Sequence, residues 1–402
     1  MIILSKGGAA SNIQKMYLFK ILGGVVFFGS VMMMFIESRG LSLSDIFYIH
    51  IAYVISMALF EAPTGYFADV YGRKKSLIVG SVVQLLSIVL FAVAESFWLF
   101  LVVEVLMGMA LAFYSGAISA LVYESLDADN RVSEYQKIWG KMQFYNFIVM
   151  ALTAMIGSVV AHCYGLVYAI YINIPSVVLM FLVALSLEEP PSVKVMAKKG
   201  YAKEFASNIV ETFRLSKALQ LIVFYSAIVY IFNQSIYPAY QNYYDLIGVS
   251  LIWFGFIHAA LQIVAGVSSF YAYRIEKALG KRTLALMLPF MVALSYLLMG
   301  SFIGVWSFVF IFFQQFVRGV KLVVVSDYIN QLVGSEQRAT ILSMESMLSK
   351  ILIAPMLLLW GVSLAFISLT ETLLLFGGIG ILVWIILWIF IEKLAQKDAQ
   401  SK

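Results

Sequence analysis

Four ionisable residues stand inside long apolar runs of the sequence: Glu104, Arg318, Lys321 and Lys350. A charge at membrane depth costs about 2.5–3.5 kcal/mol or more, so such a residue faces an aqueous cavity or a partner. These residues are therefore candidates for binding a polar ligand or carrying a proton. The sequence shows no nucleophile–base grouping, metal-ligand spacing or phosphate-binding loop, so we expect no catalytic residues, no metal and no cofactor.

The three cations lie at similar predicted depth. Each falls roughly 15–20 Å from the end of its span that we assign below to the cytoplasm. Gln314, Arg318 and Lys321 are spaced i, i+4, i+7, which puts them on one helix face. With Lys350 at the same depth, a cavity there would be positive and would bind an anionic or zwitterionic substrate.

The alternative is that acids within the protein neutralise these cations. Asp327, Glu345 and Glu104 are candidate partners for Arg318 and Lys321, and Glu345 lies five residues before Lys350. Ion pairs of this kind would cancel the positive field of the cavity.

Glu104 lies only about 10 Å below the predicted outer face. It is at a different depth from Arg318, so we do not assume that the two pair. Because burial favours the neutral form of a carboxyl group, we predict that Glu104 couples transport to protons. The alternative is a fixed role as partner of another polar group.

A stripe of polar side chains lies along one side of the predicted span 218–242. Tyrosine and amide side chains recur there at i, i+4, i+7, i+11 and i+14, with one further amide beside them. Such a face is poor for contact with lipid and suited to a wet cavity that binds a ligand, although hydrogen bonding between helices is the alternative. The residues are Tyr230, Asn233, Gln234, Tyr237, Gln241 and Tyr244.

The composition explains where these residues must sit. Of 402 residues, 62% are hydrophobic and 12% are charged, and the mean hydropathy is +0.93. A soluble domain is about half apolar and a quarter charged. The net charge of +5 is spread over short loops rather than gathered in one patch, which argues against nucleic acid. The single cysteine, Cys163, excludes an intramolecular disulfide and a cysteine metal cluster.

The apolar runs are long enough to cross a bilayer as helices, which takes roughly 20 residues each. We therefore predict an all-α membrane protein with twelve transmembrane helices in two pseudo-symmetric six-helix bundles. The predicted spans are 16–37, 45–68, 75–95, 97–125, 136–160, 165–187, 218–242, 250–274, 283–303, 304–332, 340–363 and 368–392.

Lysine and arginine predict the orientation. If odd-numbered spans run outward, the cytoplasmic segments carry nearly all of these residues and the outer loops carry Arg39 alone. This asymmetry predicts an inner-membrane protein with both termini in the cytoplasm. The segment before the first span lacks a small-residue cleavage site, so we expect it to be a cytoplasmic tail rather than a signal peptide.

One long polar connection divides the chain. Residues 188–217 are rich in charge, and Pro190–Pro191 stops the sixth span. We predict an N-terminal bundle at 1–187, a cytoplasmic linker at 188–217 and a C-terminal bundle at 218–402. The sequence GYFADVYGRKKS after span two recurs weakly as YAYRIEKALGKRT after span eight, as expected for duplicated halves.

Residues 65–75 carry a distinctive pattern of glycine, three residues, aspartate, two residues and Gly-Arg-Lys. Between spans two and three, this pattern resembles the signature loop of the major facilitator superfamily. The segments 61–64 (EAPT) and 337–340 (QRAT) are similar to a bacterial branch whose members are regarded as efflux proteins. The resemblance implies a secondary transporter that works by alternating access.

The chemistry of this loop predicts a gate. Gly65 and Gly72 permit close helix approach and a tight turn. Asp69 can pair with Arg73, which would lock one of the alternating states, although a purely topological role is the alternative for the basic residues.

The chain departs from the superfamily's exporters in two places. Glu104 stands where proton-driven exporters often carry an arginine four residues before a glycine, and the fifth span lacks a Gly-Pro pair. Both departures argue against a simple drug–proton exchange.

The resemblance to the efflux branch, the stripe of tyrosines and amides, and Glu104 nevertheless favour a monomeric, proton-coupled exporter of an amphipathic drug or metabolite. The alternative is a carrier for an anionic metabolite or siderophore-like compound.

Overall fold

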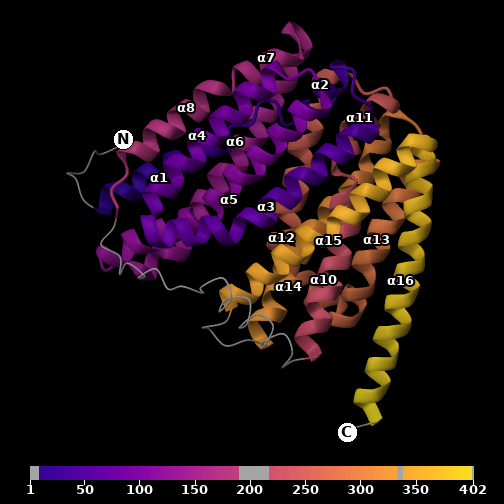
Figure 1. The fold of residues 1–402 in the computed structure, drawn as a ribbon. Helices are drawn as coiled ribbons and strands as arrows, with labels where there is room; N and C mark the ends of the chain where they lie inside the picture. Colours follow the sequence, from indigo (N-terminus) through magenta and orange to yellow (C-terminus); the bar gives the residue numbers. More distant parts are fainter. Residues whose placement is uncertain (1–8, 190–216, 333–337, 401–402) are drawn as a thin grey trace. The chain divides into compact units, whose positions relative to one another are not determined.

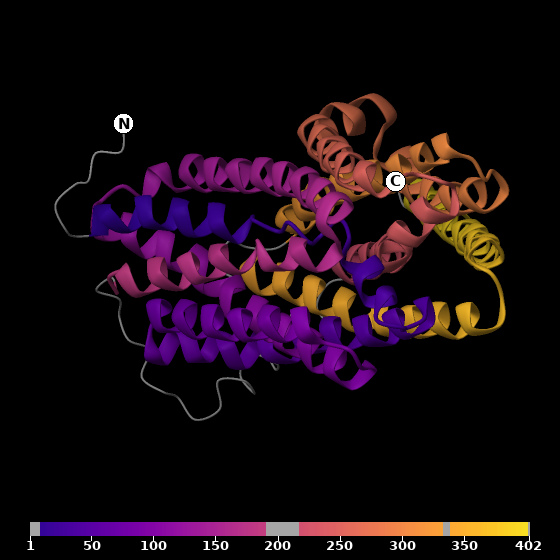
Figure 2. The same ribbon diagram turned by 90° about the horizontal axis from the view of Figure 1, so that it is seen from above.

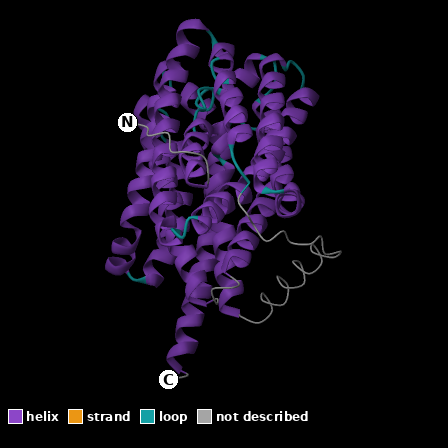
Figure 3. Cartoon of the chain, turned by 90° about the vertical axis from the view of Figure 1, so that its left-hand side faces the viewer, coloured by secondary structure: helices purple, strands orange, loops and turns teal. Residues whose placement is uncertain are grey.

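The computed structural model of the chain describes residues 9–189, 217–332 and 338–400. Within these ranges the chain forms helices joined by short loops, and no strand is drawn (Figure 3). The predicted all-α membrane fold is confirmed. The predicted linker at 188–217 falls almost wholly outside the described residues.

The described residues divide into two compact units. Unit 1 comprises 9–189 and 251–259, and unit 2 comprises 217–250 and 260–400. The domain boundaries at 187 and 218 remain a prediction.

Unit 1 is a bundle of long helices that run side by side in two perpendicular views (Figures 1 and 2). Its elements are α1 (Ala9–Gly23), α2 (Met32–Ser38), α3 (Leu43–Tyr71), α4 (Arg73–Val93), α5 (Phe97–Ala128), η1 (Val132–Glu134), α6 (Tyr135–Tyr164), α7 (Leu166–Tyr171), α8 (Ile174–Ser186) and η3 (Leu251–Trp253).

Unit 2 has α13 packed along α16, and α10 packed against α14 and α15. Its elements are α10 (Lys217–Ser235), η2 (Tyr237–Ala239), α11 (Tyr240–Leu246), α13 (Lys281–Ser301), η4 (Val305–Phe310), α14 (Ile311–Leu332), α15 (Arg338–Phe366) and α16 (Leu369–Gln400). Helix α12 (Phe254–Leu279) contributes its first residues to unit 1 and the others to unit 2.

The two copies of the duplicated loop turn in the same way. Gly72 separates α3 from α4 with a φ of 108°, and Gly280 separates α12 from α13 with a φ of 80°. Only glycine adopts such angles without steric cost, so a glycine is required in both copies.

Eleven helices in the described ranges are long and apolar enough to cross a membrane. The other expected span, 16–37, is not one helix. Helix α1 ends at Gly23, residues 24–31 form turns, and α2 begins at Met32. The first span is therefore discontinuous, which explains why it does not count as a twelfth long helix.

Side chains from elsewhere in unit 1 satisfy the backbone that this interruption frees. The N–H of Val26 donates to Thr153 Oγ1 over 3.2 Å, and the N–H of Phe27 donates to Asn173 Oδ1 over 3.0 Å. An unsatisfied backbone group in the bilayer core costs several kcal/mol, so non-helical backbone there must be buried in protein. Thr153 and Asn173 meet that condition.

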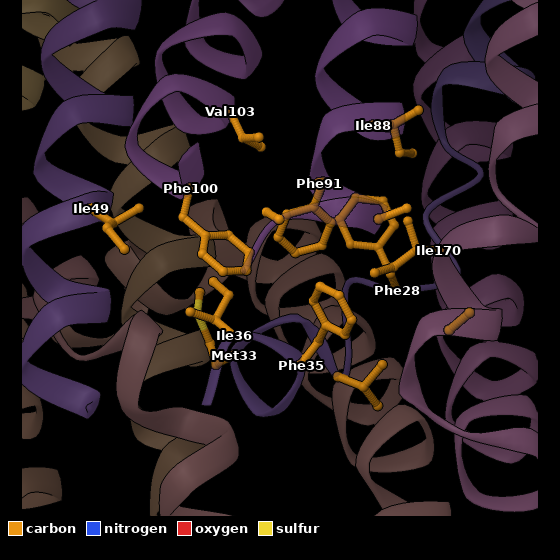
Figure 4. Packing of buried hydrophobic residues seen from close by; sticks show 14 of the residues in the cluster. Phe28, Met33, Phe35, Ile36, Ile49, Ile88, Phe91, Phe100, Val103 and Ile170 are labelled. Atoms are coloured by element: carbon orange, nitrogen blue, oxygen red, sulfur yellow. The ribbon is translucent and has the colours of Figure 1, made fainter. Parts of the chain in front are cut away.

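Aromatic rings fill the interior next to the interruption (Figure 4). The ring of Phe91 lies 5.5 Å from that of Phe28, 5.1 Å from that of Phe35 and 5.7 Å from that of Phe100. All four side chains are buried. Tilted and edge-on contacts of this kind stabilise the core beyond the area they bury, and they hold α2 against α4 and α5.

Candidate functional site

Glu104 lies against His50 inside unit 1. Both residues stand seven positions into their helices, α5 and α3, and Glu104 is 3% exposed. Glu104 Oε2 is 4.0 Å from His50 Nδ1. The helices approach closely because Gly108 has no side chain: a Cβ there would collide with the backbone carbonyl of Tyr53. The hydroxyl of Ser56 also donates to the carbonyl of Val105 over 2.7 Å.

This pair can hold a proton in a buried position. A carboxyl group and an imidazole can each bind or release a proton, and a single proton held on either group gives a pair with no net charge. The imidazole also stacks on Tyr53, with the ring centroids 5.2 Å apart, which limits its orientation. The arrangement is suited to moving a proton without leaving an isolated charge in the membrane.

Arg318 on α14 binds an amide rather than an acid. Its Nη2 donates to Gln262 Oε1 over 2.5 Å, and no ion pair of Arg318 occurs in the described part of the chain. Gly319 lets α14 approach α12, because a Cβ there would meet the carbonyl of Ala265. Arg318 is thus a partly buried guanidinium whose positive charge the described acids do not neutralise.

The charge of Lys321 is neutralised by Glu345, which the sequence offered as one of its candidate partners. Its Nζ lies 3.1 Å from Glu345 Oε1 and 5.0 Å from the ring centroid of Tyr230. Glu345 also accepts hydrogen bonds from the hydroxyls of Ser226 and Ser349. Lys321 and Glu345 therefore form a satisfied ion pair between α14 and α15.

The other amides of the predicted cavity form a buried network. Asn233 Nδ2 donates to the backbone carbonyl and to Oε1 of Gln314, over 2.7 and 3.0 Å. Gln234 Nε2 donates to Asn233 Oδ1 over 2.9 Å. Gln314 Nε2 in turn donates to Ser295 Oγ over 3.3 Å. Hydrogen bonding between helices, the alternative for this stripe, accounts for Asn233 and Gln314.

The polar stripe of the seventh span does not run along one helix. The chain leaves α10 after Ser235, passes through η2 at Pro238 and resumes in α11. Tyr237 in η2 is partly exposed, whereas Gln241 in α11 is buried. A proline removes a backbone donor and ends the helix locally, so the i+4 register assumed from the sequence is lost there.

Lys350 is the third of the predicted cations. It is partly buried on α15. Arg318 thus contacts α12 and Lys321 contacts α15, whereas Lys350 lies on α15 itself, and the shared positive cavity of the three cations stays a prediction.

The signature loop carries the ion pair expected of it. Arg73 Nη1 lies 2.6 Å from Asp69 Oδ1, and Arg73 Nε lies 3.3 Å from Glu124 Oε1 on α5. One guanidinium thus joins α3, α4 and α5. Among the described residues, the second oxygen of Glu124 is buried without a hydrogen-bond partner, so Arg73 is the group that compensates this carboxylate there.

Glu189, which follows α8 in the sequence, also binds the signature loop. Its Oε1 and Oε2 accept from the backbone N–H groups of Arg73 and Lys74, over 2.6 and 2.9 Å, at the start of α4. A carboxylate is favourable there because the first N–H groups of a helix lack partners. The carboxylate also approaches Gly72 so closely that a Cβ would collide with it. At Gly65, by contrast, a Cβ would meet no atom of unit 1 within 4 Å, so no other helix of this unit packs closely against that glycine, contrary to the expectation.

Three residues of the proton pair and the signature loop were not predicted from the sequence. His50 is an ionisable residue in an apolar run, and the criterion that selected Glu104 would have found it. Glu124 and Glu189 carried no comparable signal, because their roles depend on where α5 and the end of α8 meet the loop. In the described ranges, no group of three or more His, Cys, Asp or Glu residues could hold a metal ion.

Comparisons with known proteins agree with this architecture. The family model described as Major Facilitator Superfamily matches residues 16–350. Among curated proteins, no sequence matches the chain.

Solved structures share the fold at low identity. A structure of the nucleoside transporter NupG has a TM-score of 0.75 at 15% identity, covering 96% of this chain and 99% of that one. A D-xylose-proton symporter has a TM-score of 0.68 at 14% identity, covering 94% and 98%. The transporter PepTSo of the POT family has a TM-score of 0.73 at 13% identity, covering 96% and 98%.

Proposed function

Because the chain belongs to the Major Facilitator Superfamily, we propose that it is a proton-coupled secondary transporter that exports an amphipathic small molecule by alternating access. Membership of this family makes the chain a multi-pass membrane transporter rather than an enzyme. The proposal adds the coupling ion, the direction and the substrate class.

The observation that carries the proposal is the pair formed by Glu104 and His50. The carboxyl and imidazole lie 4.0 Å apart in the interior of unit 1, at the same depth in adjacent helices. Ionisable residues at membrane depth are costly and mark proton relays in many transporters, which supports a coupling role for this pair. A D-xylose-proton symporter is among the chains with a similar fold, which makes proton coupling compatible with this architecture.

Other features support the remaining parts of the proposal. The segment 61–64 resembles an efflux branch, which favours export. Tyr230 and Tyr237 offer partly exposed aromatic surface beside amides, which suits an amphipathic ligand. The signature loop, with Gly65, Asp69, Gly72 and Arg73, is proposed as the gate. A monomer in the inner membrane, with both termini cytoplasmic, completes the proposal, and the lysine and arginine distribution supports that orientation.

The test measures proton movement in inverted vesicles that have been energised to an acid interior, challenged with panels of lipophilic cations and organic anions. Wild-type protein should release protons when a transported compound is added. Glu104→Gln and His50→Gln should reduce this release about tenfold or more, because a group that cannot change its protonation cannot couple. Glu95→Gln, at an exposed carboxylate, is the matched control and should behave as wild type.

Counterflow separates loss of coupling from loss of folding. Exchange of labelled for unlabelled substrate needs binding and alternation but no net proton flow. Glu104→Gln should therefore retain exchange while losing proton release. Retention of both activities would remove Glu104 from the mechanism, and loss of both would mean that the residue acts in folding or binding instead.

A carrier for an anionic metabolite or siderophore-like compound is the second candidate, and Arg318 favours it. This guanidinium is partly buried and contacts the neutral amide of Gln262 in the described part of the chain. Arg318→Gln should then weaken the binding of anions selectively, whereas Lys321→Gln should not, because Glu345 already neutralises Lys321. An equal loss for anions and cations in Arg318→Gln would contradict this candidate.

A further inference from the structure

Unit 2 contains an apolar cavity that the transport mechanism does not use. Its volume is about 300 Å³, and it is lined by residues of α10, α13, α14 and α16. The lining comes from residues 221–228 of α10, 281–288 of α13, 324–328 of α14 and 387–391 of α16. Neither Arg318 nor Lys321 lines it.

The chemistry of the lining suits a hydrocarbon. Most of the lining residues are aliphatic or phenylalanine. The two tyrosine hydroxyls among the lining residues are already engaged: Tyr225 donates to the carbonyl of Ala285 over 2.8 Å, and Tyr328 donates to Glu276 Oε1 over 2.9 Å. The cavity can therefore bury an apolar chain but offers that chain no neutral hydrogen-bonding group.

One charged residue lines the cavity. Lys281, the first residue of α13, is exposed, and its Nζ lies 4.7 Å from the ring centroid of Tyr328 and 3.5 Å from Gln331 Oε1. No carboxylate pairs with it in the described ranges. The nearby acids are engaged elsewhere: Glu276 accepts from Tyr328, and Asp327 accepts from Gln331 over 2.6 Å.

Further cations stand at the same end of unit 2. Lys217 begins α10, and Arg282 follows Lys281 at the start of α13, where it pairs with Glu392 of α16. An ammonium group at the edge of a hydrocarbon-lined cavity is complementary to an amphiphile with a long apolar chain and an anionic head.

We propose that this cavity binds an acyl chain of an anionic phospholipid, with the lipid phosphate on Lys281. Basic sites between transmembrane helices bind anionic lipid headgroups at the cytoplasmic side, where the leaflet is negatively charged. The predicted topology puts the start of α13 on that side. Each buried methylene of the chain adds favourable free energy, and the lysine adds selectivity for the headgroup.

The experiment measures lipid retention by native mass spectrometry. Purified protein in detergent receives equal amounts of phosphatidylglycerol and phosphatidylcholine with identical acyl chains. Wild type should retain phosphatidylglycerol in preference, by roughly five-fold, as expected of one lysine at an anionic headgroup. Lys281→Gln should remove the preference, and Lys277→Gln, a neighbouring cation that does not line the cavity, should keep it.

Filling the cavity tests the acyl chain separately from the headgroup. Ala285→Trp should reduce the retention of both lipids, since the indole would occupy the space between α10 and α13. Ile228→Trp fills the same cavity from α10 and serves if Ala285→Trp does not give a monodisperse protein. Equal retention of the two lipids by wild type, an unchanged preference in Lys281→Gln, or full retention in a folded Trp variant would each overturn the proposal.

Discussion

The backbone N–H of Phe27 donates to the side-chain oxygen of Asn173 across 3.0 Å, although the two residues are 146 positions apart. Each residue stands at a helix interruption. Phe27 lies between α1 and α2, and Asn173 lies between α7 and α8. A polar side chain from one interruption thus satisfies the backbone of the other, which allows the break between α1 and α2 to exist at membrane depth.

We predict that Asn173→Ala destabilises the protein by about 1–3 kcal/mol, because it leaves the Phe27 N–H buried without an acceptor. The melting temperature in detergent should fall by several degrees. Ser119→Ala, which removes a hydroxyl that donates to the carbonyl of Gly116 within the same helix, is the control and should change little. An unaltered melting temperature in Asn173→Ala would mean that another group satisfies Phe27.

Gly157 on α6 lies directly against the carbonyl of Phe27, where a Cβ would overlap the backbone. We predict that Gly157→Ala costs about 1–3 kcal/mol, because the interrupted segment must move away. Gly140→Ala, on the same helix, meets no atom within 4 Å and should be neutral or stabilising by up to about 1 kcal/mol. Thermal melting of the two variants side by side makes the comparison, and a similar effect in both would refute the packing argument.

Arg73 compensates Asp69 and Glu124, so its loss should disturb the state that the loop stabilises. We predict that Arg73→Gln lowers the transport rate about tenfold, or about 1.4 kcal/mol of barrier, while substrate affinity changes little. Lys75→Gln, at an exposed position in the same loop, should transport normally. A parallel loss of affinity and rate in Arg73→Gln would show that the arginine acts in binding rather than in gating.

Lys321 and Glu345 form a partly buried ion pair, with each side chain 14% exposed. Removing one partner leaves a charge without compensation, so Lys321→Met should cost about 2–4 kcal/mol. The double variant Lys321→Met with Glu345→Gln should recover most of that loss. A double-mutant cycle of melting temperatures checks the coupling, and additive effects would show that the pair contributes no interaction free energy.

Cys163 is exposed at the end of α6 and is the single cysteine of the chain, so it reports on topology. If both termini are cytoplasmic, α6 ends at the outer face, and a membrane-impermeant maleimide should label Cys163 on intact cells. Lys137→Cys in a Cys163→Ser background puts the thiol near the start of α6, and it should react only after permeabilisation. The reverse pattern would invert the predicted orientation.

Much of the architecture follows from local properties of the sequence. A run of about 20 apolar residues crosses a bilayer whatever its neighbours are, so the spans could be drawn from residue type alone. The signature loop was also readable, because Gly72 must adopt a positive φ and Asp69 and Arg73 lie one helical turn apart. Family membership and the transporter class could be inferred from these two features.

Only the tertiary structure decided which residues meet. Gln314, Arg318 and Lys321 share one face of α14, as their spacing predicts, yet they contact Asn233 of α10, Gln262 of α12 and Glu345 of α15. Spacing along a helix specifies a face but not the neighbouring helices around it. The partner of a buried charge depends on the rotation and depth of other helices, and those are set by packing between residues far apart in the sequence. For the same reason, neither the break at 24–31 nor the meeting of Glu104 with His50 could be derived without the fold.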